Sequence, residues 1–186
     1  MSKPTRLTAA AIVGVVPLAA AVAVLAVASS AGGEGGKTMV KADTLTGYQE
    51  ATPAGVSSAG TGSFSATIDD DSSTISFELR YTGLTTPALQ AHPHFGNRFT
   101  SGGVSAFLCG GPKPACPPGT SGEAVVTGTI VPSDVIGPAG QGIAAGEFGE
   151  LVDAIRAGMT YVNVHNSTFP AGEIRGQIND DNQRQP

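Results

Sequence analysis

Alternation of apolar and polar residues is the dominant pattern in this sequence. Two runs between residues 63 and 81 alternate strictly, with apolar side chains at Phe64, Ala66, Ile68, Ile75, Phe77, Leu79 and Tyr81. The polar stretch 69–73 between them has the composition of a turn, so the pair predicts a β-hairpin. Shorter alternating runs follow at 124–130 and 161–165. The pattern predicts an all-β fold, a single antiparallel β-sandwich or barrel of about seven to eight strands.

One segment departs from this period of two. Phe148, Leu151, Val152 and Ile155 recur at helical spacing, and Gly158 is placed where a helix would end. We therefore expect one short helix of about three turns. The sequence shows no internal repeat and no sign of a second folded domain.

The first 31 residues have the layout of an export signal. Lys3 and Arg6 precede an apolar run, and small residues follow it. An uncleaved membrane anchor is the alternative, because roughly 20 apolar residues span a bilayer. We expect a signal peptide at 1–31, a flexible leader at 32–43, a β-domain at 44–179 and a polar tail at 180–186. The predicted location is secreted or extracytoplasmic at the cell surface, with membrane contact only if the signal segment is uncleaved.

Charge and composition narrow the range of partners. The chain has 10 Lys and Arg residues against 15 Asp and Glu, and removal of residues 1–31 leaves eight against 15, a net charge of −7. Such an acidic surface does not neutralise phosphates, so nucleic acid is not an expected partner. With no Trp and 5% aromatic residues, an aromatic stacking platform for single-stranded nucleic acid or sugar is not expected either.

Cys109 and Cys116 are the two cysteines of the chain. An even cysteine count in an exported protein favours a disulfide, which here would close a short loop. A cysteine-containing metal site is the alternative interpretation.

The three histidines, His92, His94 and His165, are the candidate site residues. His92 and His94 alternate along one predicted strand, so both side chains emerge on one face while Leu89 and Ala91 point toward the core. His165 ends a later strand with the same outward parity. If these strands are neighbours, their spacing of about 4.8 Å brings the three imidazoles within reach of one ion. Imidazole suits copper and zinc, and three protein ligands leave a position for water or an exogenous group.

Two features leave alternatives open. The histidines can equally be polar-face residues bonded to loop carbonyls, without a metal. Pro93 separates His92 from His94, and proline is confined to strand edges, strand starts and bulges, so the site requires the chain there to stay extended. Of the acidic residues near strand ends, Glu173 shares a face with Arg175 by parity, which predicts an exposed ion pair.

Several short motifs occur between residues 44 and 179. They are Leu45–Glu50 followed by Pro53, Gly83-Leu84, Ala91–Gly96, Tyr161–His165 and Gly172–Ile178. Together they resemble the CHRD domain, which is named for its occurrence in chordin. The resemblance implies a secreted or surface β-domain that in bacteria often stands alone behind an export signal. It does not imply the growth-factor antagonism of chordin, because this chain lacks the cysteine-rich modules that such binding would use.

The histidine motif departs from the family's usual Ala-His-Ile-His-Gly, since Pro93 replaces the middle residue and Phe95 is added. It is also similar to the His-x-His copper-ligand strand of copper–zinc superoxide dismutase, a β-barrel that binds its metal outside the barrel. That similarity implies copper, with zinc as the alternative. Dismutase activity is not favoured, because that enzyme uses four histidines at copper alone and this chain has 3.

We therefore predict an exported, non-catalytic CHRD β-domain with a three-histidine surface site for a transition metal, formed by His92, His94 and His165. Copper is favoured over zinc. One alternative is an extracellular structural or adhesive module that binds a protein or a cell-wall polymer without metal. A redox enzyme of the superoxide dismutase type is the third hypothesis. The sequence does not decide whether the protein is an enzyme, but it favours a protein without enzymatic activity.

Overall fold

The computed structural model describes residues 36–180, so the predicted signal peptide and residues 181–186 of the tail lie outside the described residues. The described part is one antiparallel sheet with a single α-helix, which confirms the predicted fold class. The strands are β1 (Lys37–Thr46), β2 (Thr61–Asp69), β3 (Thr74–Thr82), β4 (Ala88–Phe95), β5 (Gly103–Val104), β6 (Ala124–Ile130), β7 (Thr160–Asn166), β8 (Ile174–Gln177) and β9 (Asn179–Asp180). The helical elements are α1 (Phe148–Arg156) and the 3-10 turns η1 (Gly47–Gln49), η2 (Pro132–Asp134) and η3 (Ala139–Gln141).

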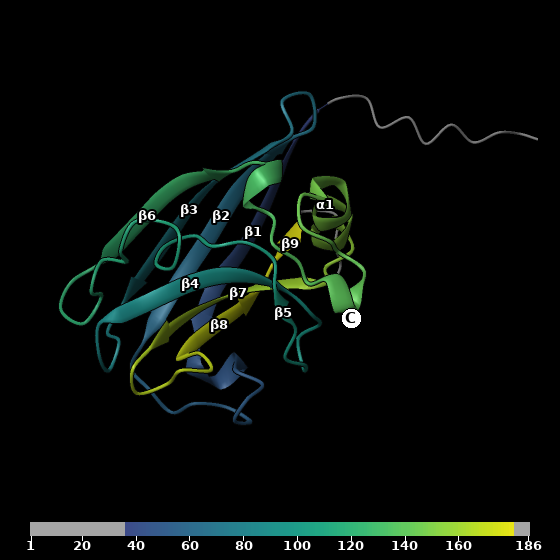
Figure 1. Ribbon diagram of the computed structural model, residues 1–186. Coiled ribbons are helices and arrows are strands. Elements are labelled where there is room, and N and C mark those ends of the chain that lie inside the picture. Colours follow the sequence, from purple (N-terminus) through teal and green to yellow (C-terminus); the bar gives the residue numbers. More distant parts are fainter. Residues whose placement is uncertain (1–35, 181–186) are drawn as a thin grey trace, which may run out of the picture. The chain divides into compact units, whose positions relative to one another are not determined.

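The sheet runs in the order β5-β4-β7-β8-β1-β2-β3-β6, and β9 also pairs with β1. Strand β1 joins the two halves because it pairs with β2 along most of its length, while Thr46 at its end pairs with Arg175 of β8. A register shift between Ala42 and Leu45 bends β1 between these partners. The sheet curls back on itself, with β4, β7 and β8 facing β1, β2 and β3 (Figure 1), and residues of both halves share one apolar core.

The predicted hairpin is confirmed as β2 and β3, paired without a register break from Thr61 opposite Thr82 to Asp69 opposite Thr74. Its inward side chains, including Ile68 and Leu79, are fully buried. The turn residues satisfy their own backbone, since Asp69 Oδ1 accepts a hydrogen bond from the Ser72 amide.

The first strand begins earlier than the sequence predicted. The expectation of a flexible leader up to residue 43 is wrong for residues 37–43, which belong to β1. Val40 and Ala42 alternate with exposed residues and bury their side chains, and Lys37 pairs with Asp69 in register and as an ion pair of 3.6 Å. Pairing with β2 and burial of Val40 and Ala42 therefore order this segment. Its few small apolar residues did not form an alternating pattern long enough to predict a strand.

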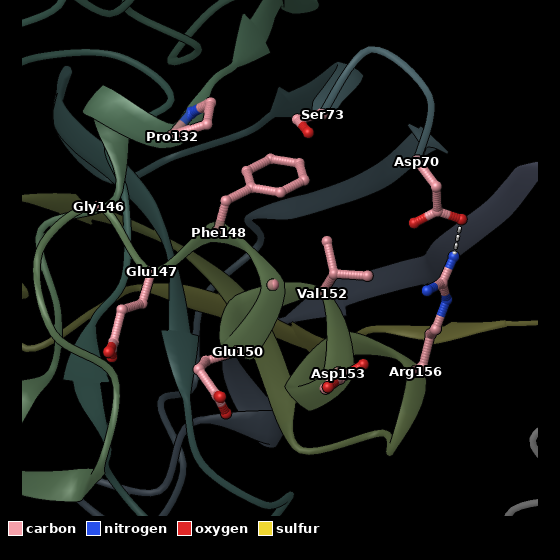
Figure 2. Close-up of a pocket in the computed structure, with 11 residues that line it drawn as sticks. Asp70, Ser73, Pro132, Gly146, Glu147, Phe148, Glu150, Val152, Asp153 and Arg156 are labelled. Carbon is pink, nitrogen blue, oxygen red and sulfur yellow. Dashed lines mark hydrogen bonds and ion pairs between the residues drawn. The ribbon is translucent and has the colours of Figure 1, made fainter. Parts of the chain in front are cut away.

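The helix α1 follows the predicted pattern. Leu151, Val152 and Ile155 are buried against the sheet, and Gly158 beyond the helix end adopts a positive φ of 68°. A groove of about 560 Å³ runs along the helix, and Figure 2 shows Arg156 reaching across to the β2–β3 turn, where its Nη2 donates to Asp70 Oδ2 at 2.6 Å. No helix within residues 36–180 combines the length and apolar character required to cross a membrane.

Leu151→Ala is expected to lower the free energy of unfolding by about 2–5 kcal/mol, because the substitution leaves a cavity under α1. Asp70→Ala removes an ion pair whose side chains are 35% and 34% exposed, so it is expected to cost only about 0–1 kcal/mol. Equilibrium urea denaturation of both variants measures the difference. Equal losses would contradict the expectation that the apolar face contributes more than the ion pair.

Candidate metal centre

Strands β4 and β7 are direct neighbours, as the sequence-based site required. They pair antiparallel, with His92 opposite Asn163, His94 opposite Tyr161 and Gln90 opposite His165. His165 therefore lies diagonally across from His92 on the same face of the sheet. Adjacent pairing brings together histidines that are more than 70 residues apart in the sequence.

Pro93 does not break β4. Its carbonyl accepts a hydrogen bond from the Ser105 amide at 2.9 Å, so its backbone polar side faces the short strand β5 and not β7. The β4–β7 ladder therefore loses no donor at the proline. The strand stays extended to Phe95, and the two histidines keep the parity that the site needs.

The opposite end of β4 differs from the prediction. A register shift between Ala88 and Gln90 reverses the alternation there, so Leu89 is 55% exposed whereas Ala88 is buried. The predicted core position of Leu89 is thus wrong, whereas that of Ala91 is right. Because the irregularity lies before Ala91, it leaves both histidines in phase.

The three imidazoles form one cluster. One ligand nitrogen from each of His92, His94 and His165 lies within 4.8 Å of the other two. The ring centroids of His92 and His165 are 4.5 Å apart, and His92 Nδ1 is 3.1 Å from His94 Nε2. For a metal ion bonded at about 2.0–2.1 Å to each nitrogen, these separations need only small ring movements.

The cluster is deeper than a surface site. His92 and His94 are only 4% and 7% exposed, so the prediction that they lie on the outer surface is wrong in that respect. The chain after β4 folds back over them, and the ring of Phe107 packs edge-on against His92 at 4.8 Å. Parity placed the histidines on the face away from the apolar core, but it does not show which loops cover that face.

The disulfide Cys109–Cys116 is present, as the cysteine count predicted. It closes the loop directly after the segment that covers the histidines. Leu108 donates its amide to the Ala91 carbonyl at 2.8 Å, and Ala91 in turn donates to Cys109 at 3.2 Å. The disulfide loop is thus anchored to the residue that precedes His92.

Backbone carbonyls face ring nitrogens of two imidazoles. His94 Nδ1 lies 2.9 Å from the Gly102 carbonyl, and His165 Nδ1 lies 3.1 Å from that of Pro170. A carbonyl only accepts, so Nδ1 of His94 carries the hydrogen and its Nε2 carries a lone pair. At His165 both ring nitrogens face an oxygen, because Nε2 also lies 2.7 Å from Asn163 Oδ1. Carbonyls that accept from the ring nitrogen not bound to the metal are typical partners of metal-binding histidines.

The remaining acceptor atoms converge on the same point. His92 Nε2 lies 3.0 Å from Gln90 Oε1, which leaves a lone pair on its Nδ1, facing His94 Nε2. The Asn163 amide donates to the Ala171 carbonyl, so Asn163 Oδ1 faces His165 Nε2 at 2.7 Å. His92 Nδ1 and His94 Nε2 therefore face each other as two acceptors without a hydrogen between them, an arrangement that a cation would satisfy.

Burial keeps the imidazoles neutral. Desolvation lowers the pKa of His92 to about 2 and that of His165 to about 4. It also lowers the pKa of His94, where the charge of Arg175 acts in the same direction. All three rings are therefore in the unprotonated form that binds metals at neutral pH.

The ring of Tyr161 stacks against His94 and also contacts the guanidinium group of Arg175. The Tyr161 ring lies 4.8 Å from that of His94 at an angle of 6°, and the Arg175 guanidinium carbon lies 3.3 Å above the Tyr161 centroid. Arg175 Nη2 also donates to the carbonyls of Asn97 and Thr100. The loop that contains Gly102 is therefore tied to the sheet on which His94 lies.

The predicted exposed pair of Glu173 and Arg175 is wrong. Both side chains are buried, at 0% and 2% exposure. Glu173 instead accepts hydrogen bonds from Thr85 and Asn166. Arg175 donates to the carbonyls of Asn97 and Thr100, so segments distant in the sequence bury the two side chains separately.

The sequence analysis also missed Gln90, Asn163 and Phe107 as neighbours of the histidines. Gln90 and Asn163 have the same strand parity as the histidines, which is the signal that marks them. Phe107 comes from a loop and has no such signal.

In metal-free protein with chelator, the free energy of unfolding is expected to fall as the pH is lowered from about 6.5 toward 4. Unfolded histidines take up protons in this range, whereas folded His165 and His92 do so only near their pKa values of about 4 and about 2. Burial raises the pKa of Glu50 from 4.5 to about 7, which gives the opposite slope because the folded state then binds the extra proton. Urea denaturation of Glu50→Gln across this range isolates the histidine contribution. An unchanged slope after adding His165→Gln would contradict the assignment.

The family model of the CHRD domain matches residues 42–178. No curated protein and no solved structure matches the chain. The matched range begins within β1 and runs past β8, so it contains the complete histidine cluster and the disulfide. Because the match covers well over half of the 186 residues, the chain belongs to the CHRD domain family.

Proposed function

We propose that this CHRD domain is an exported, non-catalytic protein that binds one transition metal ion through His92 Nδ1, His94 Nε2 and His165 Nε2. The observation that carries the proposal is that one ring nitrogen of each histidine lies within 4.8 Å of the other two, while the outward nitrogens of His92 and His94 are already bonded to oxygen atoms. Gln90 Oε1 and the Gly102 carbonyl orient these rings before any ion binds. Such preorganisation lowers the conformational cost of metal binding.

Copper is the proposed metal, with zinc as the alternative. The donor set is three neutral imidazoles, which suits copper and zinc better than the oxygen-seeking cations magnesium and calcium. Between the two, nitrogen sites bind Cu²⁺ more tightly than Zn²⁺. His92 and His94 are buried, and neutral imidazoles suit such a site because they bind a metal at neutral pH without first losing a proton.

A binding or storage role fits the enclosure of the cluster better than turnover of a substrate. Phe107 and the segment before the disulfide cover His92, which restricts access to the ion. The export part of the proposal is supported by the signal-like residues 1–31 and by the disulfide, since disulfides persist mainly in oxidising compartments.

The purified protein, prepared without a histidine tag, is expected to bind about one equivalent of Cu²⁺, and more weakly one of Zn²⁺. The variant His92→Ala/His94→Ala/His165→Ala is expected to lose this binding, because it removes every histidine of the chain. Isothermal titration calorimetry measures both, and circular dichroism checks the fold of the variant. Undiminished affinity in a folded variant would reject the site, and the alternative of a metal-free interaction module would then be preferred.

Gln90→Leu is expected to weaken metal affinity by about 10- to 100-fold, because it removes the oxygen that orients His92. Leu89→Ala is the matched control, since Leu89 precedes Gln90 on the same strand but is exposed and makes no contact with the imidazoles among those described. Competition titration with a chromogenic chelator gives the two affinities. Equal affinities would show that Gln90 has no part in arranging the site.

A further inference from the structure

The disulfide Cys109–Cys116 closes a loop that lies against the histidine cluster. The proposed metal site takes no ligand from this loop. Two of its glycines nevertheless lie in contact with groups that hold His92 in position. The inference drawn from these contacts concerns the regulation of the metal centre, and it rests on the proposed function.

Phe107 connects the loop to His92. Its ring packs edge-on against the imidazole, with the two ring centroids 4.8 Å apart. Gly111 lies against the same ring, since a methyl group at Gly111 would come within 2.5–3.1 Å of three of its atoms. The ring is thus in contact with both the imidazole and the backbone of the disulfide loop. Its position depends on where the loop holds Gly111.

Gln90 is the second connection between the loop and His92. Its Oε1 lies 3.0 Å from His92 Nε2. Gly110 packs on Gln90 so closely that a methyl group at Gly110 would lie 3.1 Å from both Cα and Cγ of Gln90. Gly110 and Gly111 have φ values of 72° and 55°, a conformation that other residues rarely adopt. Consecutive residues of the loop therefore support the two groups that contact His92.

Both ends of the loop are bonded to β4. At the first end, the Ala91 amide donates to the Cys109 carbonyl at 3.2 Å. At the other end, the Ala88 amide donates to the Pro118 carbonyl at 3.0 Å, two residues beyond Cys116. The disulfide joins these two attachments across a separation of seven residues.

The interior of the loop is attached less firmly. The Gly110 amide donates to the Pro114 carbonyl at 2.7 Å, and the Lys113 amide donates to the Gly110 carbonyl at 3.0 Å. These bonds connect residues of the loop with one another, so they shape the turn without fastening it to β4. Lys113 Nζ also reaches Asp134 Oδ1 at 2.7 Å, in an ion pair whose side chains are 27% and 20% exposed. The covalent bond therefore limits how far the loop can open.

We propose that the Cys109–Cys116 disulfide regulates metal affinity by holding Gly110 and Gly111 against the two groups that position His92. With the bond intact, Gln90 and Phe107 keep the imidazole in its metal-binding orientation. An external dithiol reduces the bond: each cysteine gains a hydrogen, and the dithiol is oxidised to its own disulfide. The loop then opens, His92 gains rotational freedom, and metal binding has to restore the lost order. Tight metal binding is thereby coupled to an oxidising compartment, where disulfides persist.

The variant Cys109→Ser/Cys116→Ser opens the loop without leaving free thiols, which are themselves copper ligands. It is expected to bind Cu²⁺ about 10- to 100-fold more weakly than the wild-type protein, as is usual when the groups that orient a metal ligand are lost. Competition titration with a chromogenic chelator measures both affinities, and circular dichroism checks the fold. Equal affinities in a folded variant would overturn the proposal.

Gly111→Ala keeps the disulfide but places a methyl group against the Phe107 ring, so it is expected to weaken Cu²⁺ binding as well. Gly122→Ala is the matched control. Gly122 also has a positive φ, of 89°, but a methyl group there would meet no atom within 4 Å. The control is expected to leave the affinity unchanged. Equal affinities of the two glycine variants would contradict the role of the Phe107 contact and overturn the proposal.

NMR of the metal-free protein tests the positioning of His92 directly. Because Gln90 Oε1 only accepts, His92 Nε2 carries the ring hydrogen while this contact is held. Imidazole ¹⁵N spectra are expected to show this tautomer in the oxidised protein and a mixture of tautomers after reduction with dithiothreitol. His165 is the internal control, since its ring nitrogens face Pro170 and Asn163, outside the loop.

An unchanged His92 tautomer after complete reduction would overturn the proposal. Failure of the wild-type protein to bind Cu²⁺ would instead reject the proposed metal function. The two failures are distinguishable, because the NMR measurement needs no metal and decides by itself whether the disulfide positions His92.

Discussion

The antiparallel pairing of β4 with β7 is the interaction on which the rest of the site depends. It sets His92 opposite Asn163 and brings His165 diagonally beside His92. A slip of one residue would turn the histidines toward the apolar core, because side chains alternate between the faces of a strand. Buried apolar residues on the reverse face, among them Val162 and Val164, prevent that slip. The core thus fixes the register, and the register assembles the polar cluster.

The face of β4 and β7 away from the core is covered by loops where it carries His92 and His94. The segment 96–109 crosses it and touches the site in several ways. Gly102 accepts from His94, Phe107 packs on His92, and Arg175 holds the carbonyls of Asn97 and Thr100. Polar side chains can remain buried here because the loop carbonyls and amides satisfy most of them. Within the described residues, four buried side-chain atoms have no hydrogen-bond partner: Glu50 Oε1, Ser105 Oγ, Thr160 Oγ1 and Gln177 Oε1.

One loop borders both the histidine cluster and the hollow lined by Tyr48 and Phe99. Its Gly102 end holds an imidazole of the cluster, and its Phe99 end forms a wall of the hollow. The structure places Tyr48 and Phe99 at one pocket, from segments about 50 residues apart. Composition counts side chains, whereas a pocket depends on which of them meet.

The sequence by itself determined the elements that follow a regular period. Alternation predicted the β2–β3 hairpin, helical spacing predicted α1, and the parity of His92 and His94 was correct. These features depend on neighbours within a few residues, so the local pattern contains them. Only the tertiary structure decided that β4 adjoins β7, that Leu89 lies at a register shift, and that Phe107 covers the cluster. Those features arise from contacts between distant segments, whose pairing is selected by burial of the whole core and leaves no periodic signal in either segment alone.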